Sequence, residues 1–358
     1  MNTLTIIPDT SAVQFALLKG DAICARRTIP YSDFGKTGDD KQAEHSIGNF
    51  VQQNVQRNLG VIACRVPAGA AEFTQPVIAD RENRRRLAEL APMAPMHIPA
   101  ILSLLEVCDN LFPNTPSVLV FETAFFVDLP KREHLYAINL AEQLMHGIRR
   151  FGYHGLFHET AVRLVHAERQ HGARDPDSLR TVSICLERRP EVAGVRGFRA
   201  MVTSGGATPL EGIPGERTCG QIDPGIPTVL AERLQWAPER INELLTRQSG
   251  LFGLLGYAVT MGEILGEQAS HAPPEKRLAH ELISYCLLRH AGMAAAALGG
   301  VDALVISGRY CNQGEKVARQ ILSSLLAPGN QPPEAASVHI LNRPIELIIA
   351  DDAKPLVR

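Results

Sequence analysis

Short apolar runs of strand length alternate with longer segments of helical periodicity along most of the chain. This alternation is typical of an α/β protein, in which helices pack on the faces of a sheet. Strands are predicted at residues 4–7, 14–18, 61–65, 117–121, 181–186, 191–196 and 303–307. Helices are predicted at residues 82–90, 100–110, 133–146, 226–234, 241–246, 276–298 and 314–326. The pattern therefore predicts an α/β fold in two halves.

The chain has 358 residues, more than a single hydrophobic core usually organises, so we expect two domains. Hydrophobic residues make up 45% of the sequence, which is enough to fill both cores. Residues 91–95 and 208–227 are rich in proline and glycine and lie between predicted elements. We interpret these two segments as loops at a site, and not as linkers between domains.

Charge and cysteine content argue against several classes of function. With 36 basic and 38 acidic residues the formal net charge is -2, which gives no basic bias for nucleic acid. The seven cysteines include no C-x-x-C pair, which favours a reducing compartment over a disulfide framework or a zinc site. No secretion signal opens the sequence, and no apolar stretch is long enough to span a bilayer. We predict a cytoplasmic protein that binds neither nucleic acid nor membrane.

Two motifs carry the most specific signal. Residues 120–126 read V-F-E-T-A-F-F, and residues 149–155 read R-R-F-G-Y-H-G. They closely resemble the F-D-T-A-F-H and R-R-Y-G-F-H-G motifs of the acetate kinase family. The resemblance places Glu122 at the family's aspartate and His154 at the histidine of its acyl-phosphate site.

The resemblance extends over most of the chain. Residues 73–78 follow the family pattern, and Arg65 just before them matches its carboxylate-binding arginine. The segment L-A-P-M-A-P-M-H-I-P at residues 90–99 is similar to L-A-P-L-H-N-P and places His97 on a second substrate-site histidine. Pro209 lies in T-P-L-E-G, a further matching segment on the substrate side. Other similar segments are C-G-Q-I-D-P-G at 219–225 and S-G-L-F-G-L-L-G at 249–256.

The resemblance implies a fold and its division. The expected fold is the two-domain acetate and sugar kinase/Hsc70/actin (ribonuclease H-like) α/β fold, with a cleft between the domains. Residues 1–149 would form the domain on the carboxylate side, completed by the segment 346–358. Residues 150–345 would form the domain on the nucleotide side, through which a homodimer would assemble.

The chemistry of phosphoryl transfer to a carboxylate requires a guanidinium for the acid, donors for the phosphoryl oxygens and a carboxylate for Mg²⁺. Arg65 is the candidate for the short-chain carboxylate, and His97 and His154 for the phosphoryl group. Glu122 and Glu346 are the candidate Mg²⁺ ligands, although Glu122 is one methylene longer than aspartate. Taken alone, each of these residues would more often be structural, as a surface ion pair, a hydrogen-bonded histidine or a helix cap.

A catalytic arginine of the family is displaced in this chain. In G-T-R-C-G-D-I-D-P the arginine aligns with Thr218, and Arg217 stands one residue earlier. A shift of one residue usually turns a side chain elsewhere, yet in an irregular loop Arg217 could still reach the site. Arg217 is therefore the candidate substitute.

The segments that would hold ATP depart from the family. The first hairpin, N-A-G-S-S-S-L-K, becomes P-D-T-S-A-V-Q at residues 8–14, which loses a backbone donor, gains the charge of Asp9 and leaves Ser11 as the phosphate candidate. The glycine loop H-L-G-N-G becomes C-L-E-R-R at 185–189, where Arg188 and Arg189 either bind an anion or are solvated, and we favour solvation.

The loop on the adenosine side also departs. The family's G-G-I-G-E-N becomes G-R-Y-C-N-Q at residues 308–313. Gly308 and Asn312 remain as candidate nucleotide contacts. Tyr310 either fills the purine slot or stacks on a base, and we favour filling.

Two functions follow from these observations. The first is a divergent carboxylate kinase that makes an acyl phosphate, or runs the reverse reaction, with ATP or another phosphoryl donor such as pyrophosphate. The second is an inactive homologue whose pocket binds a carboxylate or acyl phosphate, or whose surface binds a protein partner. We favour the kinase because a shifted arginine and a glutamate for aspartate are reparable changes.

Overall fold

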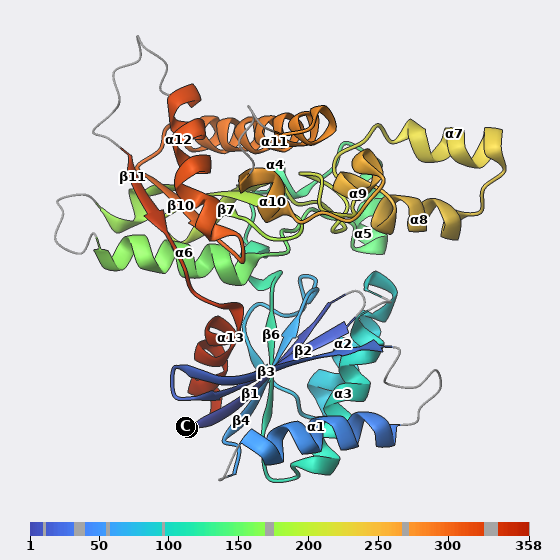
Figure 1. Cartoon of the computed structure of the whole chain (residues 1–358), viewed down its shortest axis with the longest axis vertical. Coiled ribbons are helices and arrows are strands. Elements are labelled where there is room, and N and C mark those ends of the chain that lie inside the picture. The colour runs from blue at the N-terminus through green and yellow to red at the C-terminus, as the bar shows by residue number, and fades with distance from the viewer. Residues whose placement is uncertain are drawn as a thin grey trace. The chain divides into compact units, whose positions relative to one another are not determined.

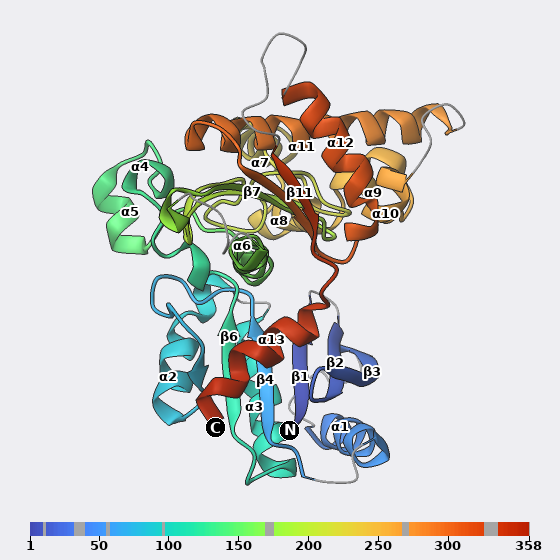
Figure 2. The same ribbon diagram turned by 90° about the vertical axis from the view of Figure 1, so that its left-hand side faces the viewer.

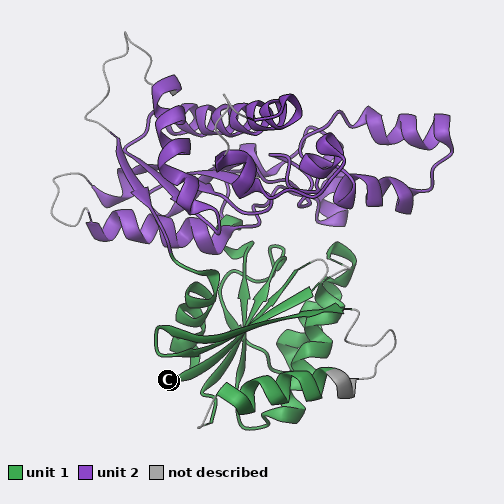
Figure 3. Cartoon of the chain, in the orientation of Figure 1, with its two compact units in different colours: residues 1–127, 343–358 green, residues 128–342 purple. Residues whose placement is uncertain are grey.

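The computed structural model describes residues 1–9, 12–31, 40–54, 58–94, 97–168, 175–266, 272–325 and 336–357. The chain divides into two compact units (Figure 3). Unit 1 comprises residues 1–127 and 343–358, and unit 2 comprises residues 128–342. Residues 128–149, which the sequence analysis gives to the first domain, pack with unit 2. The chain therefore leaves unit 1 after Val127 and returns to it at Arg343 for its last segment.

Unit 1 is built on a six-stranded mixed sheet with the order β3-β2-β1-β4-β6-β5. β1, β4 and β6 are parallel neighbours, whereas the hairpin β1-β2-β3 and the short β5 pair in antiparallel fashion. The strands are β1 (Asn2–Pro8), β2 (Ala12–Lys19), β3 (Ala22–Pro30), β4 (Val61–Val66), β5 (Val77–Ile78) and β6 (Ser117–Phe121). The parallel strands thus end at one common edge of the sheet.

Helices cover both faces of this sheet (Figure 2). α1 (Asp40–Asn54), α2 (Arg81–Glu89) and α3 (Ile98–Leu111) pack against one face and share one core cluster with β1, β4 and β6. α13 (Ile345–Ala353), from the end of the chain, contacts β1, β4 and β6 on the other face. Because both faces are covered, β6 is buried along its whole length, which explains its continuous apolar run.

Unit 2 contains a five-stranded sheet with the order β11-β10-β7-β8-β9 (Figure 1). β7, β10 and β11 are parallel, and β8 and β9 extend the sheet as antiparallel strands. The strands are β7 (Arg180–Cys185), β8 (Glu191–Arg196), β9 (Arg199–Thr203), β10 (Ala303–Ser307) and β11 (Ser337–Ile340).

The second sheet is also sandwiched between helices. Ala303 and Val305 of β10 join one core cluster with α6 (Gly155–Glu168). Leu304 and Ile306 join another cluster with α11 (Pro274–Leu298) and α12 (Gly314–Leu325). The alternation of these side chains along β10 therefore assigns α6 to one face and α11 and α12 to the other.

The remaining helices of unit 2 are α4 (Lys131–His134), α5 (Leu140–His146), α7 (Gly225–Leu234), α8 (Pro238–Arg247), α9 (Gly250–Leu255) and α10 (Met261–Gly266). Of these, α9 and α10 add buried side chains to the core cluster of α11 and α12. Short 3-10 turns occupy Ala91–Met93, Ala124–Phe126, Pro176–Ser178, Cys311–Gln313 and Lys354–Val357. A search of the described helices finds none with the length and apolarity needed to cross a membrane.

The predicted strands are confirmed, but the single helix predicted at residues 133–146 is wrong. Two short helices, α4 and α5, replace it, with an extended residue at Leu135 between them. The Asn139 side chain accepts hydrogen bonds from the N–H groups of Ala141 and Glu142 and so starts α5 afresh. The Gln143 side chain binds the intervening backbone and holds it out of the helix. The predicted end at residue 326 lies outside the described residues, as does Ser11.

Gly69→Ala should destabilise unit 1, because Gly69 lies against the stacked rings of Phe73 and Phe121, whose centroids are 4.3 Å apart. An added Cβ would lie 2.6 Å from Cδ1 of Phe121. We expect the free energy of unfolding in urea to fall by about 1–3 kcal/mol.

The matched control is Gly48→Ala in α1, where the nearest atom, Cδ2 of Leu111, would lie 3.4 Å from the new Cβ. Alanine favours a helix over glycine, so we expect stability to be unchanged or raised by up to about 1 kcal/mol. Equal effects of the two substitutions would contradict the packing argument.

Candidate active site

Arg65 and Glu122 form a buried ion pair at the carboxyl edge of the first sheet. Arg65 lies near the end of β4, and Glu122 directly follows the neighbouring parallel strand β6. Nε of Arg65 lies 2.5 Å from Oε1 of Glu122, whose side chain is fully buried. The backbone N–H of Glu122 donates to the carbonyl of Val66 at 3.0 Å. Because a buried carboxylate needs a charged partner, the pair fixes both side chains at this edge.

His97 lies within electrostatic reach of this pair. It is the residue before α3 and is partly buried. Burial lowers the pKa of His97, and the positive charge of Arg65 lowers it further, against the opposing effect of Asp9. The imidazole is therefore neutral at pH 7, with one donor and one acceptor nitrogen. The structure thus pairs Arg65 with Glu122 and places His97 near enough to Arg65 for that charge to lower the pKa of His97.

Glu346 is engaged elsewhere in unit 1. It is buried in the first turn of α13, where its Oε1 accepts hydrogen bonds from Nε of Arg26 at 2.6 Å and from Nε2 of Gln14 at 2.8 Å. These bonds anchor α13 to β2 and β3. Glu346 therefore has a structural role in this conformation.

The predicted Mg²⁺ ligands do not make a ready metal site. Glu122 and Glu346 are each paired with an arginine. Among the described residues, no group of three or more His, Cys, Asp and Glu side chains is placed to hold a metal ion. Mg²⁺ is often held by one or two carboxylates together with substrate phosphates, so a site that lacks phosphate has few ligands to offer. The residues as placed do not fit a preformed Mg²⁺ site.

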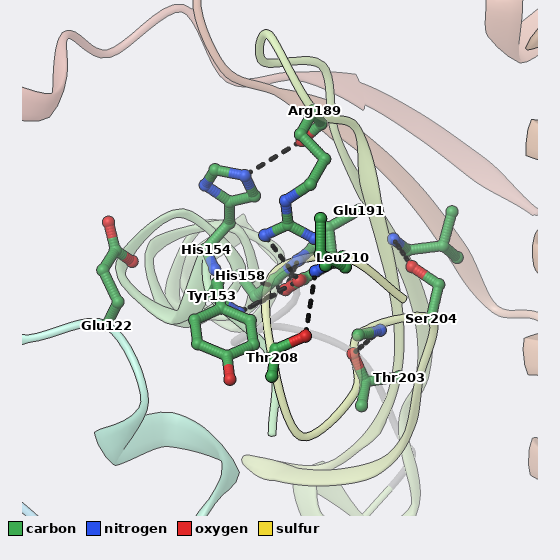
Figure 4. A network of polar contacts seen from close by, with 12 residues as sticks. Glu122, Tyr153, His154, His158, Arg189, Glu191, Thr203, Ser204, Thr208 and Leu210 are labelled. Carbon is green, nitrogen blue, oxygen red and sulfur yellow. Dashed lines mark hydrogen bonds and ion pairs between the residues drawn. The ribbon is translucent and has the colours of Figure 1, made fainter. Parts of the chain in front are cut away.

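The predicted histidine of unit 2, His154, belongs to a polar cluster around Glu191 (Figure 4). The carboxylate of Glu191 accepts from the backbone N–H of Tyr153 at 2.9 and 3.0 Å and from that of His154 at 3.2 Å. Nε2 of His158 lies 3.4 Å and an Nη of Arg189 lies 3.6 Å from its oxygens. The carboxylate thus lies where two backbone N–H groups just before α6 converge with cationic or hydrogen-bonding side chains.

Glu191 remains ionised although it is completely buried. Burial alone would raise its pKa, but the hydrogen bond from His158 and the charges of Arg189, His154 and His158 lower the pKa to about 2. The carboxylate is therefore a permanent charge at neutral pH, held by its partners.

The position of His154 is fixed by two bonds. Its backbone N–H reaches Glu191, and its Nε2 lies 3.0 Å from the carbonyl oxygen of Arg189. A carbonyl oxygen only accepts, so Nε2 of His154 carries a proton in this arrangement. Arg189 thus contributes its backbone to His154 and its side chain to Glu191, and does not point freely into solvent.

The loops after β7 and β10 hold the other candidate nucleotide contacts. Gly308 has a φ of +90°, and a Cβ there would lie 2.6 Å from the carbonyl oxygen of Leu186, so only glycine fits. Asn312 is exposed in the turn before α12. Arg188 pairs at 3.9 Å with Glu216.

Pro209, the predicted residue on the substrate side, lies exposed in the loop before Glu211.

The side chain of Arg217 contacts Phe252 and the backbone of Arg247. Its guanidinium carbon lies 4.4 Å above the ring centre of Phe252, and its Nη1 donates to the carbonyl of Arg247 at 3.3 Å. Thr218, at the family's arginine position, directs its buried hydroxyl towards Gly215, where a Cβ would lie 2.5 Å from it. The guanidinium of Arg217 is therefore engaged within unit 2 by Phe252 and Arg247.

Two site residues, Glu191 and Glu216, were missed by sequence reasoning. Glu191 opens β8, and a charged residue at the end of a strand that is otherwise apolar was the only available signal. Glu216 stands next to Arg217 in an irregular loop and gave no signal.

The sequence and the structure are similar to known acetate kinases. A family model described as the Acetokinase family matches residues 31–353. The acetate kinase of Carboxydothermus hydrogenoformans is 30% identical over 277 residues, which cover 76% of this chain and 68% of the relative. Across three curated acetate kinases the matched regions cover 62 to 68% of the relatives' own length.

Solved structures show the same fold. The crystal structure of Porphyromonas gingivalis acetate kinase has a TM-score of 0.83 at 23% identity and covers 100% of both chains. A propionate kinase from Francisella tularensis has a TM-score of 0.84 at 21% identity and covers 99% of both chains. These likenesses confirm the predicted fold.

Glu191→Gln should destabilise the protein at neutral pH by about 3 kcal/mol, because it leaves the buried partners of the carboxylate uncompensated. The pKa of Glu191 is lowered from 4.5 to about 2 on folding. A lowered carboxyl pKa stabilises above pH 4.5, and this contribution is lost as the pH falls towards 2. Denaturation curves at successive pH values should therefore show the two proteins converging across this window.

Glu159→Gln on α6, the helix that carries His158, is the matched control, since Glu159 makes a more exposed ion pair with Arg163. We expect it to change stability by less than about 0.5 kcal/mol. A deficit of Glu191→Gln that stays constant from neutral pH to the acid end of the window would refute the role of the charge.

Proposed function

Because the chain belongs to the acetokinase family, we propose that it transfers a phosphoryl group between a donor and the carboxylate of a short organic acid. The observation that carries this proposal is the Arg65 guanidinium, held by buried Glu122 at the carboxyl edge of β4 and β6 within electrostatic reach of His97. Acetate and propionate are the acids named for the similar proteins, and both are small enough for one guanidinium to orient.

In this proposal Arg65 binds the acid. A guanidinium presents five N–H donors in a planar fork that matches a carboxylate. The bond from Nε to Glu122 fixes the plane of that fork, so the incoming carboxylate meets an oriented partner. Because the guanidinium is already oriented, binding of the acid would not have to restrict the Arg65 side chain further.

His97 and His154 are the proposed ligands of the transferring phosphoryl group. Phosphoryl oxygens accept hydrogen bonds, and a histidine N–H can donate to them. Nε2 of His154 already carries a proton, and in this conformation its N–H donates a hydrogen bond to the Arg189 carbonyl. His97 is neutral at pH 7 because burial and Arg65 oppose its charge. Arg217 is a further proposed ligand, which in this conformation is held by Phe252 and Arg247.

We propose that Mg²⁺ binds together with the phosphoryl donor. The described carboxylates do not form a Mg²⁺ site by themselves. Mg²⁺ would neutralise charge on a phosphoryl donor, and Glu122 is the proposed protein ligand if it exchanges Arg65 for the metal. ATP is the donor that the family suggests, and pyrophosphate is the alternative suggested by the rebuilt loops. The homodimer through unit 2 and the cytoplasmic location stay predictions.

A specific observation favours a second function. In unit 2 the loops after β7 and β10 are bonded to one another by their own side chains. An inactive homologue that binds a carboxylate or acyl phosphate in unit 1 would keep Arg65 and His97 and would have no use for those loops.

The deciding experiment is acyl phosphate formation, trapped with hydroxylamine, by protein free of host acetate kinase. Acetate, propionate and butyrate are each combined with Mg²⁺ and ATP, GTP or pyrophosphate. We expect turnover with at least one pair. Arg65→Ala should lower kcat/KM for the acid about a hundredfold, the value of a charge-assisted bidentate contact of roughly 3 kcal/mol, and Glu122→Ala should abolish turnover.

Arg85→Ala is the matched control, because Arg85 lies on the same unit but makes only exposed ion pairs with Glu82 and Glu89. It should leave kcat/KM unchanged. Absence of turnover with every acid and donor would reject the kinase and leave the binding function to be tested by the stabilisation that acetate or acetyl phosphate gives to the folded protein.

A further inference from the structure

The carboxyl edge of the second sheet is where a ligand of unit 2 is expected. β7 and β10 are parallel neighbours, with Cys185 opposite Ser307 at their ends. The loops at 186–190 and 308–313 leave this edge, and α12 starts at Gly314 immediately afterwards. In open α/β sheets, ligands bind outside the carboxyl ends of the parallel strands. The side chains of these two loops therefore decide what can bind here.

The Tyr310 side chain occupies part of this edge and packs against the interior of unit 2. Its backbone N–H donates to the carbonyl of Leu186 at 3.0 Å, and its hydroxyl donates to Oε1 of Glu216 at 2.6 Å. The ring packs so closely on Gly262 that a Cβ there would lie 2.6 Å from Cδ1 of the ring. The tyrosine is thus anchored at both ends and is partly buried against the core of unit 2.

Arg309 joins the two loops directly. Its backbone N–H donates to Oε1 of Glu187 at 2.8 Å, and its Nε donates to Oε2 at 2.7 Å. Both carboxylate oxygens are therefore used, in a two-point contact that is stronger and more directional than a single bond. Glu187 and Arg309 stand where the family motifs have glycines, so the two replacements bind one another.

Glu216 ties two further segments to Tyr310. Its Oε1 also accepts from the backbone N–H of Met261 at 2.9 Å, and its Oε2 lies 3.9 Å from Nε of Arg188. One carboxylate therefore holds the start of α10, the loop after β7 and the Tyr310 ring. Displacing the ring would leave this carboxylate without its shortest hydrogen bond.

The cavity next to Glu216 is small. It has a volume of about 170 Å³ and is lined by Glu216, Arg217, Phe252, Ala258, Val259, Thr260 and Glu263. Pockets for drug-sized ligands start at roughly 300 Å³. This cavity, which Tyr310 does not line, is too small for a purine nucleoside.

We infer that Tyr310 and Arg309 are specificity-determining residues that close this edge of unit 2 to a nucleoside. The phosphoryl donor is then one without a nucleoside, an inorganic polyphosphate of the size of pyrophosphate, and this half of the inference rests on the proposed function. A small donor needs only N–H groups and cations, whereas ATP also needs room for a base and a ribose.

The test measures binding and not turnover, by titration calorimetry of the full chain with Mg²⁺ and either ATP or pyrophosphate. Wild type should bind pyrophosphate and show no heat with ATP. The double variant Arg309→Gly with Tyr310→Ala, which removes the loop bridge and the ring, should bind ATP at least about tenfold more tightly than wild type. Its affinity for pyrophosphate should stay within about twofold of the wild-type value.

Tyr285→Ala is the matched control, since Tyr285 is 64% exposed on α11, and it should leave both affinities unchanged. If circular dichroism shows that the double variant is unfolded, Tyr310→Leu takes its place, because it keeps an apolar contact with Gly262 and still shortens the side chain.

Each result decides. Wild type that binds ATP as tightly as the opened variant, or an opened variant that still fails to bind ATP, overturns the exclusion of nucleosides. Wild type that fails to bind pyrophosphate overturns the donor. If ATP binds only to the opened variant while no acid is phosphorylated with any donor, the exclusion stands and the kinase proposal fails.

Discussion

The Glu191 carboxylate is the interaction on which the arrangement of the candidate site in unit 2 depends. A fully buried charge is tolerated only where partners replace its water. Here the replacements come from the segment before α6, from α6 itself and from the loop after β7. Residues 153–158 are thereby fixed to residues 189–191, which lie more than thirty positions later in the sequence. The same bonds set the backbone of His154 and, through Arg189, the protonated nitrogen of its ring.

Unit 1 also contains a fully buried carboxylate, that of Glu122, and stabilises it with an ion pair. Glu122 is as buried as Glu191, but one guanidinium, that of Arg65, supplies its principal charge partner. The two residues lie on neighbouring parallel strands, so the register of β4 and β6 is what brings them together. A charged pair at a sheet edge stabilises less than apolar packing of the same volume would. The pair is therefore weak evidence for stability, which agrees with the proposed role of Arg65 in binding the acid.

The sequence was informative where local signals decide the structure. The runs at residues 117–121 and 303–307 are buried on both faces, and the observed strands β6 and β10 have those same bounds. It was less informative where side chains override periodicity, as in residues 133–146, where Asn139 and Gln143 divide an apparent helix. α1 was missed because its composition is polar, and α6 because residues on more than one of its faces are buried.

The same division holds for the site. Arg65, His97 and Glu122 could be predicted from motifs, because each lies in a short segment with a recognisable pattern. Their contacts could not be predicted when the partner is remote: Glu191 binds Tyr153 across 38 positions, and Glu216 binds Tyr310 across 94. The residues next to either glutamate in the sequence do not predict such a long-range hydrogen bond. Arg217 shows the reverse case, a residue chosen by position in a motif whose side chain packs on Phe252 instead.

The altered loops of unit 2 differ from what unconstrained loss of a nucleotide site would leave. Substitutions without a function usually leave exposed side chains with few contacts. Here Glu187 and Arg309, which replace two glycines of the family motifs, bind each other through both carboxylate oxygens. The Tyr310 ring packs against Gly262, and its hydroxyl donates a hydrogen bond to Glu216. Because each of these side chains has a matching partner, the edge is an ordered structure, which agrees with the inference that it is closed to a nucleoside.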